Sequence, residues 1–114
     1  MSRLVNRAAL VVRPRQPFLD WAASMDPDGP TDSRSFKPHV SVYLVAEDPK
    51  GQEETAPVKN YYEYIFGAEL RNWWTDQRKW PTRRTLKLFH EWFEVVGQSV
   101  IIDLETTQLN VEEE

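Results

Sequence analysis

Two helical patterns in the middle of the chain hold most of its aromatic residues. Apolar residues recur at three- and four-residue spacing from Val58 to Trp73, the spacing that gathers side chains on one face of an α-helix. A second pattern of this kind begins after Pro81 and ends at Phe93. Ten of the 14 aromatic residues lie between positions 61 and 93. We therefore expect two consecutive helices that cover one face of a small β-sheet.

The residues around these patterns indicate where each helix starts and stops. The hydroxyl of a threonine before a helix accepts a hydrogen bond from a free N–H of the first turn. Thr55 is placed to cap the first helix, and either Thr82 or Thr85 the second. The first helix is expected to end within residues 74–76. Gly67 lies inside it and weakens an isolated helix by about 1 kcal/mol relative to alanine, so we expect a packing reason for this glycine.

Three other segments alternate in the manner of β-strands. Residues 5–12 present apolar side chains on both faces, which is typical of a central strand. Residues 40–46 and 95–104 alternate in the same way. Gly97 and Gln98 are expected to bend the last of these strands.

The element order β-α-β-α-α-β predicts an α+β fold in a single domain, residues 1–106. A short amphipathic helix is expected from Pro17 to Met25, followed by a loop over residues 26–38. The expected sheet is three-stranded and mixed, with helices on one face. Its first two strands would be parallel through a right-handed crossover, and the third would pair antiparallel with the first. Residues 107–114 are expected to form a weakly ordered acidic tail.

Composition narrows the class of protein. The 114 residues are 40% hydrophobic and 28% charged, which is typical of one globular domain. The absence of cysteine excludes disulfides and Cys-ligated zinc or iron–sulfur sites. No apolar run approaches the roughly 20 residues of a membrane span, and the N-terminus does not have the pattern of a signal peptide. A cytoplasmic protein is expected.

The net charge of −4 hides a strong asymmetry. Residues 71–87 contain six basic residues and one acidic residue, whereas residues 91–114 contain seven acidic residues and neither lysine nor arginine. Such a pattern can steer a partner of opposite charge. It is also the pattern of a solvated helix face followed by a frayed tail.

The candidates for metal or catalytic chemistry are isolated. His90 and Glu94 have the spacing of two ligands on one helix face, but His39 follows no metal-binding spacing, so no metal or cofactor is predicted. No motif for a serine nucleophile or a phosphate loop is present. Among the carboxylates we considered Glu63, Glu69 and Asp103, and no two can be shown to converge.

Asp103 lies in an apolar strand, and we expect it to pair with an arginine such as Arg7. These features together predict a non-enzymatic protein.

A cluster of tryptophan and arginine residues lies between the two helical patterns and at the start of the second. Its candidate binding residues are Trp74, Arg78, Trp80, Arg83 and Arg84. Tryptophan and arginine are common in protein-binding hot spots, and they also bind single-stranded nucleic acid by stacking and phosphate contacts. The same residues are compatible with core and rim positions of the fold. The acidic pI of about 5.2 favours a protein partner over nucleic acid.

Short motifs are spread over most of residues 4–104: Val5-Asn6-Arg7, Pro17-Phe18-Leu19-Asp20-Trp21, Ile65-Phe66, Glu69-Leu70, Trp74, Trp80-Pro81, Arg84, Phe89, Trp92-Phe93 and Asp103-Leu104. With these motifs the chain resembles a family of small uncharacterised bacterial proteins, a domain of unknown function. The resemblance implies a stand-alone domain and assigns no activity and no catalytic residue.

The sequence therefore predicts a small interaction module that binds another protein, in the manner of an immunity protein or an antitoxin. The partner would meet either residues 73–84 or the acidic C-terminal half. The alternative is nucleic-acid or nucleotide binding through residues 73–84. The oligomeric state is left open.

Overall fold

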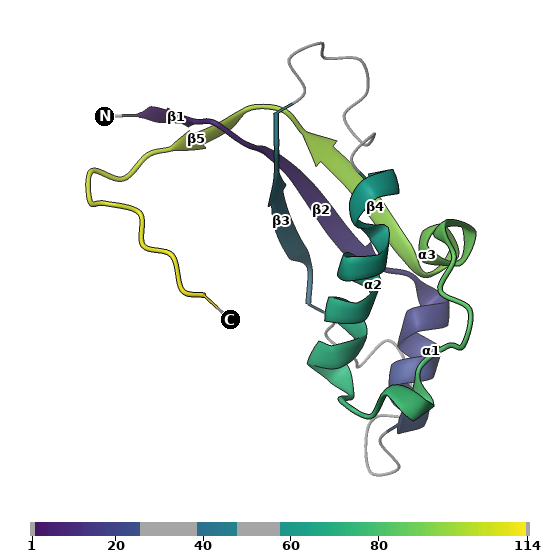
Figure 1. Ribbon diagram of the computed structural model, residues 1–114. Helices are drawn as coiled ribbons and strands as arrows, with labels where there is room; N and C mark the ends of the chain where they lie inside the picture. The colour runs from purple at the N-terminus through teal and green to yellow at the C-terminus, as the bar shows by residue number, and fades with distance from the viewer. Residues whose placement is uncertain (1, 26–38, 48–57, 114) are drawn as a thin grey trace.

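The computed structural model describes residues 2–25, 39–47 and 58–113, and within them the chain forms an α+β fold (Figure 1). Its helices are α1 (Gln16–Met25), α2 (Val58–Trp73) and α3 (Leu86–Trp92), with a short 3-10 helix, η2, at Gln77–Lys79. Its strands are β1 (Arg3–Val5), β2 (Ala8–Pro14), β3 (Ser41–Val45), β4 (Phe93–Gln98) and β5 (Ile101–Asp103). The predicted α+β class is confirmed.

The strands form two antiparallel sheets, one with the order β3-β2-β4 and one with β1 beside β5. Strand β2 is central, and β4 pairs antiparallel with it, as the sequence predicts. The predicted parallel pairing of the first two strands is wrong, because β3 also runs antiparallel to β2, so the three-stranded sheet is antiparallel and not mixed. Residues 15–40 are long enough to return to either end of the sheet, so the length of this connection does not decide the direction of β3.

Two of the three predicted strands are each divided in two. Three residues, 6–8, separate Val5 from Ala9, whereas two residues, 99–100, separate the paired positions Ile101 and Gln98. The N-terminal strand therefore carries one extra residue, which is the arrangement of a β-bulge. Beyond this bulge, β1 and β5 continue as a two-stranded ribbon that projects from the rest of the molecule (Figure 1).

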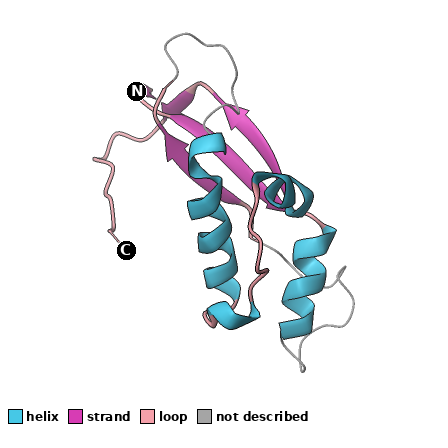
Figure 2. Cartoon of the chain, turned by 45° about the vertical axis from the view of Figure 1, so that its right-hand side comes forward, coloured by secondary structure: helices cyan, strands magenta, loops and turns pink. Residues whose placement is uncertain are grey.

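Alternate residues of the three-stranded sheet face the helices, which lie together on one side of it (Figure 2). Leu10 and Val12 of β2 are fully buried there, and Val45 of β3 joins them. The neighbouring β3 residues Val42 and Leu44 are more than half exposed. The alternation predicted for β3 is therefore observed. The face of β3 that includes Tyr43, which is the more polar face in the sequence, is the one that packs against the core.

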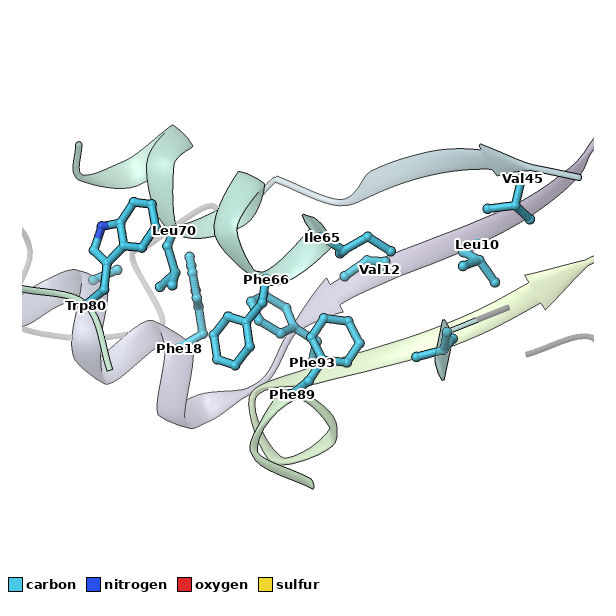
Figure 3. Close-up of a cluster of buried hydrophobic side chains, with 12 residues drawn as sticks. Leu10, Val12, Phe18, Val45, Ile65, Phe66, Leu70, Trp80, Phe89 and Phe93 are labelled. Carbon is cyan, nitrogen blue, oxygen red and sulfur yellow. The ribbon is translucent and has the colours of Figure 1, made fainter. Parts of the chain in front are cut away.

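Aromatic rings fill the centre of the core between α1, α2 and α3 (Figure 3). The Phe66 ring lies 5.8 Å from that of Phe89, 5.7 Å from Trp92 and 5.5 Å from Phe93, measured between centroids. Phe18 of α1 lies 5.2 Å from Phe93. Tilted and edge-on contacts of this kind are the favoured arrangements of aromatic pairs.

Local signals set the ends of α3. Thr85, not Thr82, is the N-cap, and its Oγ1 accepts a 3.1 Å hydrogen bond from the Leu88 amide. The helix stops one residue before predicted, because Phe93 is extended (φ −138°, ψ 140°) and already belongs to β4. The predicted loop over residues 26–38 and the predicted cap Thr55 lie outside the described residues.

Residues 104–113 form neither helix nor strand, and their side chains are exposed. Among the described helices, none combines the length and the apolar character needed to cross a membrane.

Candidate binding surfaces

Tryptophan side chains tie the helical layer together. The indole N–H of Trp21 donates to the Lys79 carbonyl at 2.9 Å, and that of Trp73 donates to the Ala22 carbonyl at 2.8 Å. The Trp80 N–H donates to the Trp74 carbonyl at 2.7 Å. These bonds satisfy backbone acceptors that helix ends and turns leave without an internal partner. Much of the predicted tryptophan-rich segment is therefore part of the scaffold.

The aromatic members of the predicted binding segment differ in exposure. Trp80 is only 6% exposed and belongs to the core, so its ring offers almost no surface to a partner. Trp74 is 37% exposed. The segment therefore lacks the pair of open stacking rings that the nucleic-acid hypothesis requires.

The arginines of this segment also differ. Arg78 is held by Asp76, with Nε–Oδ1 and Nη2–Oδ2 distances of 3.0 Å. The hydrogen bond from the Arg78 side chain, reinforced by one from its backbone N–H, lowers the pKa of Asp76. Arg83 is exposed. Arg84 lies over the Trp80 ring at 5.6 Å from its centroid, and its Nη1 donates to the Pro81 carbonyl at 2.9 Å.

Arg84 lines a pocket that was not predicted from the sequence. Arg71 of α2 lies over the same Trp80 ring, 6.0 Å from the centroid, and lines the pocket together with Arg84 and Gln77. Arg71 is not among the predicted binding residues, although it belongs to the basic stretch of residues 71–87. Only the packing of α2 against residues 77–84 places both guanidinium groups at the same ring and the same pocket.

A second surface lies on the side of the sheet away from the helices. We call it the open face, and its apolar members are Val11, Val42, Leu44 and Val96, which alternate with the core-facing residues of their strands. Val42 and Leu44 are 59% and 53% exposed. Within the described part of the chain, β3 and β4 each pair with β2 on one side, which leaves their outer edges open.

The β1–β5 ribbon extends this apolar surface. We call its exposed apolar residues the ribbon stripe, and each of them is between 54% and 74% exposed: Leu4, Val100, Ile102 and Leu104. Leu4 pairs with Ile102 in the ladder, so the two side chains lie on the same side of the ribbon. Val96, Gln98 and Val100 follow one another at two-residue spacing, so the polar Gln98 lies between the open face and the ribbon stripe.

Arg3 and Asp103 form an ion pair on the opposite side of the ribbon. They are ladder partners, and Arg3 Nη2 lies 2.9 Å from Asp103 Oδ2. The same nitrogen donates to the carbonyls of Glu105 at 3.2 Å and Thr107 at 2.9 Å, which turns the following chain back. The predicted ion pair of Asp103 with an arginine is observed, but the partner is Arg3 and not Arg7, because the antiparallel ladder places Arg3 opposite Asp103.

A groove of about 690 Å³ runs between the C-terminal half of β3 and the first half of α2. Its lining is mostly apolar and aromatic, with Tyr43 and Leu44 from the strand and Tyr61 and Tyr64 from the helix. Arg7 also lines it. Tyrosine-rich clefts beside an open strand edge are suited to contacts with a protein chain.

The predicted carboxylates do not form a catalytic pair. Glu63 lines the Arg71 pocket, Glu69 is buried against β3, and Asp103 lies in the ribbon. His90 is exposed near the end of α3, and Glu94 belongs to β4, so these two residues do not share a helix face. No three acidic or histidine side chains of the described residues are grouped as a metal site requires.

No protein-family model, curated protein or solved structure matches this chain. The resemblance to a family of small bacterial proteins stays a prediction.

Proposed function

We propose that this protein is a non-enzymatic interaction module that binds another protein through the open face and the ribbon stripe. The observation that supports it best is that exposed apolar side chains lie both on the open face of the three-stranded sheet and, beyond Gln98, on the ribbon. Soluble monomers rarely expose a contiguous apolar patch larger than a few hundred Å² unless it has a binding role.

The ribbon itself has a physical reason to need a partner. A two-stranded ribbon is at best marginally stable in water unless a third strand or a helix covers it. The Cα radius of gyration is 16.1 Å, compared with roughly 13 Å expected for a compact domain of this length. A protein that covers Leu4 and Ile102 would bury apolar surface and fix the ribbon at the same time.

Charge indicates what kind of protein would fit. The end of the ribbon and the following chain contain Asp103, Glu105 and the run Glu112–Glu114, with neither lysine nor arginine among residues 103–114. The partner we propose therefore has an apolar patch with basic residues at its rim. An acidic inhibitor of a basic protein, as in an immunity protein or an antitoxin, has this relationship.

Nucleic-acid or nucleotide binding is the second candidate. It would use the exposed Trp74, Arg78, Arg83 and Arg84, but the burial of Trp80 removes one stacking ring and Asp76 neutralises Arg78. Phosphate contacts would have to outweigh a net charge of −4. The apolar surface has no part in such binding, so we rank this function lower.

Site-specific cross-linking tests the protein-binding proposal. A photoreactive benzophenone amino acid is placed at Leu44 or at Ile102, with a matched control at Asn72, which is exposed on α2. After irradiation in the cells that naturally make the protein, we expect one partner to be captured from Leu44 and Ile102 but not from Asn72.

Purified components then give the affinity. Val42→Asp and Ile102→Asp should each weaken binding at least about tenfold, because truncation of a central apolar contact typically costs more than 1 kcal/mol. Deletion of residues 108–114 should slow association, since rim charges act mainly on the on-rate. Equal capture from all three positions, or unchanged affinity with both aspartate variants, contradicts the proposal. Capture of a second copy of this chain would contradict the proposal that the partner carries basic residues at the rim of its apolar patch.

A further inference from the structure

The pocket between Arg71 and Arg84 has no part in the proposed protein binding, because it lies among the helices on the other side of the sheet. Its volume is about 530 Å³, within the roughly 300–1,000 Å³ typical of small-molecule sites. We propose that it binds a small molecule through an oxyanion, a phosphate or carboxylate group held between the two guanidinium groups.

Neither guanidinium is neutralised by a residue that the structure describes. Among the described residues, no carboxylate lies within ion-pair distance of Arg71 or Arg84. A guanidinium has five N–H donors; Arg84 uses one on the Pro81 carbonyl, and Arg71 makes its contact with the Trp80 ring. Both groups therefore have unused donors in the geometry that carboxylates and phosphates accept in pairs.

Trp80 holds both arginines in place. Its ring is buried, its N–H is bound to the Trp74 carbonyl, and both guanidinium carbons lie within about 6 Å of its centroid. An arginine that already stacks on a fixed indole has few side-chain conformations, so it loses less conformational entropy when it binds a ligand. The pocket is in this sense organised before any ligand arrives.

Gly67 supplies an independent observation. It lies in the middle of α2, where glycine is unfavourable, and it lines this pocket. A Cβ at this position would lie 4.0 Å from the nearest atom of the Trp80 ring, an ordinary contact, so the predicted packing reason is not found. The physical consequence of the missing side chain is open space beside Arg71, one turn away on the same helix face. We infer that the glycine keeps room for the ligand.

The remaining lining residues restrict the ligand. Glu63 and Tyr64 lie on the pocket wall one turn before Gly67, and Glu63 adds a negative charge at that end. A polyanion such as a nucleic-acid strand is therefore disfavoured. A small ligand with one oxyanion and a hydrogen-bond donor away from it fits both ends of the pocket.

Titration with inorganic phosphate, and separately with acetate, tests the proposal at constant ionic strength. The indole ¹H–¹⁵N signal of Trp80 reports directly on the pocket. We expect a saturable shift of this signal with at least one of the two anions, and none with chloride at the same concentration. The anion that saturates at lower concentration identifies the phosphate or the carboxylate as the natural group. Absence of saturation with both anions overturns the proposal.

Matched variants separate a defined site from general charge. Arg71→Gln and Arg84→Gln should each weaken the binding about tenfold or more, because each removes a charged hydrogen-bond donor. Arg83→Gln removes the same charge from a neighbouring position outside the pocket and should leave the affinity unchanged. An equal loss in all three variants, with binding of single-stranded oligonucleotides that falls steeply with salt, would indicate a diffuse phosphate surface and overturn the pocket.

Gly67→Ala separates a role in ligand binding from a role in folding, because the two roles predict different changes in thermal stability and anion affinity. The alanine should raise the midpoint of thermal unfolding, because it favours the helix and meets no close contact. The same variant should weaken anion binding several-fold, because its methyl group occupies the pocket. A more stable protein with unchanged anion affinity would contradict the inference about Gly67.

Discussion

The hydroxyl of Tyr43 donates a 2.7 Å hydrogen bond to Oε2 of Glu69, which joins the edge strand β3 to the helix α2. Ser41, two residues earlier on the same strand, donates to both oxygens of this carboxylate at 3.0 and 3.1 Å. Glu69 is 7% exposed, and a buried carboxylate is costly unless hydrogen bonds replace its water. The two hydroxyls therefore fix the position of β3 on α2, beside the tyrosine-lined groove.

Loss of the Tyr43 hydroxyl should destabilise the fold. We expect Tyr43→Phe to lower the free energy of unfolding by about 1–3 kcal/mol, because it leaves a buried charged acceptor with one donor fewer. Urea denaturation at pH 7 measures this. Tyr61→Phe is the matched control, since Tyr61 is 42% exposed, and it should change stability by less than about 0.5 kcal/mol. Equal effects of the two variants would mean that the bond to Glu69 contributes nothing.

The same pair predicts a loss of stability at alkaline pH. Burial, followed by the hydrogen bond to Glu69 and the charge of that residue, raises the pKa of Tyr43 above its usual value. The folded protein therefore keeps this phenol protonated at a pH where the unfolded chain ionises, which is about pH 10. Its contribution to stability is fully present below that pH and is progressively lost above it.

Thermal unfolding at several pH values between 8.5 and 11 should therefore bring wild type and Tyr43→Phe closer together as the pH rises. All other tyrosines are common to both proteins. Parallel curves over this range would contradict the assignment to Tyr43.

Capping of α3 gives a prediction with a control three residues away. Thr85→Ala should cost about 1 kcal/mol, because Thr85 Oγ1 no longer accepts the hydrogen bond from the Leu88 amide. Thr82→Ala removes the same hydroxyl from an exposed position outside the helix and should stay within about 0.5 kcal/mol of wild type. Chemical denaturation ranks the two, and a larger cost for Thr82→Ala would place the helix start elsewhere.

The centre and the edge of the aromatic core should respond differently to truncation. Phe66 is fully buried among Phe89, Trp92 and Phe93, so we expect Phe66→Ala to cost about 3–5 kcal/mol. Trp92 is only partly buried, and we expect about 1–3 kcal/mol for Trp92→Ala. Denaturation curves of both variants test this order. A greater loss for Trp92→Ala would show that the indole, not Phe66, is the central ring.

The candidate surfaces were predicted less well than the secondary structure. The sequence drew attention to residues 73–84, and Arg84 does line a pocket, but its partner Arg71 comes from α2 and Trp80 is buried. The ribbon stripe was visible only as an alternation in the last strand. Its exposure could not be predicted, since the same alternation would also fit a strand that is covered on one face.

What the sequence by itself determined is the helix that starts at Val58, which ends at Trp73 rather than within the expected residues 74–76, the central position of β2, and the alternation along β3. These follow from the 3.6- and two-residue periods of the backbone, which any short segment obeys without its neighbours. The tertiary structure decided the direction of β3, the register that joins Arg3 to Asp103, and the meeting of Arg71 with Arg84 over Trp80. Each of these depends on how distant segments share one core, and the free energy of that packing is a property of the whole chain rather than of any stretch within it.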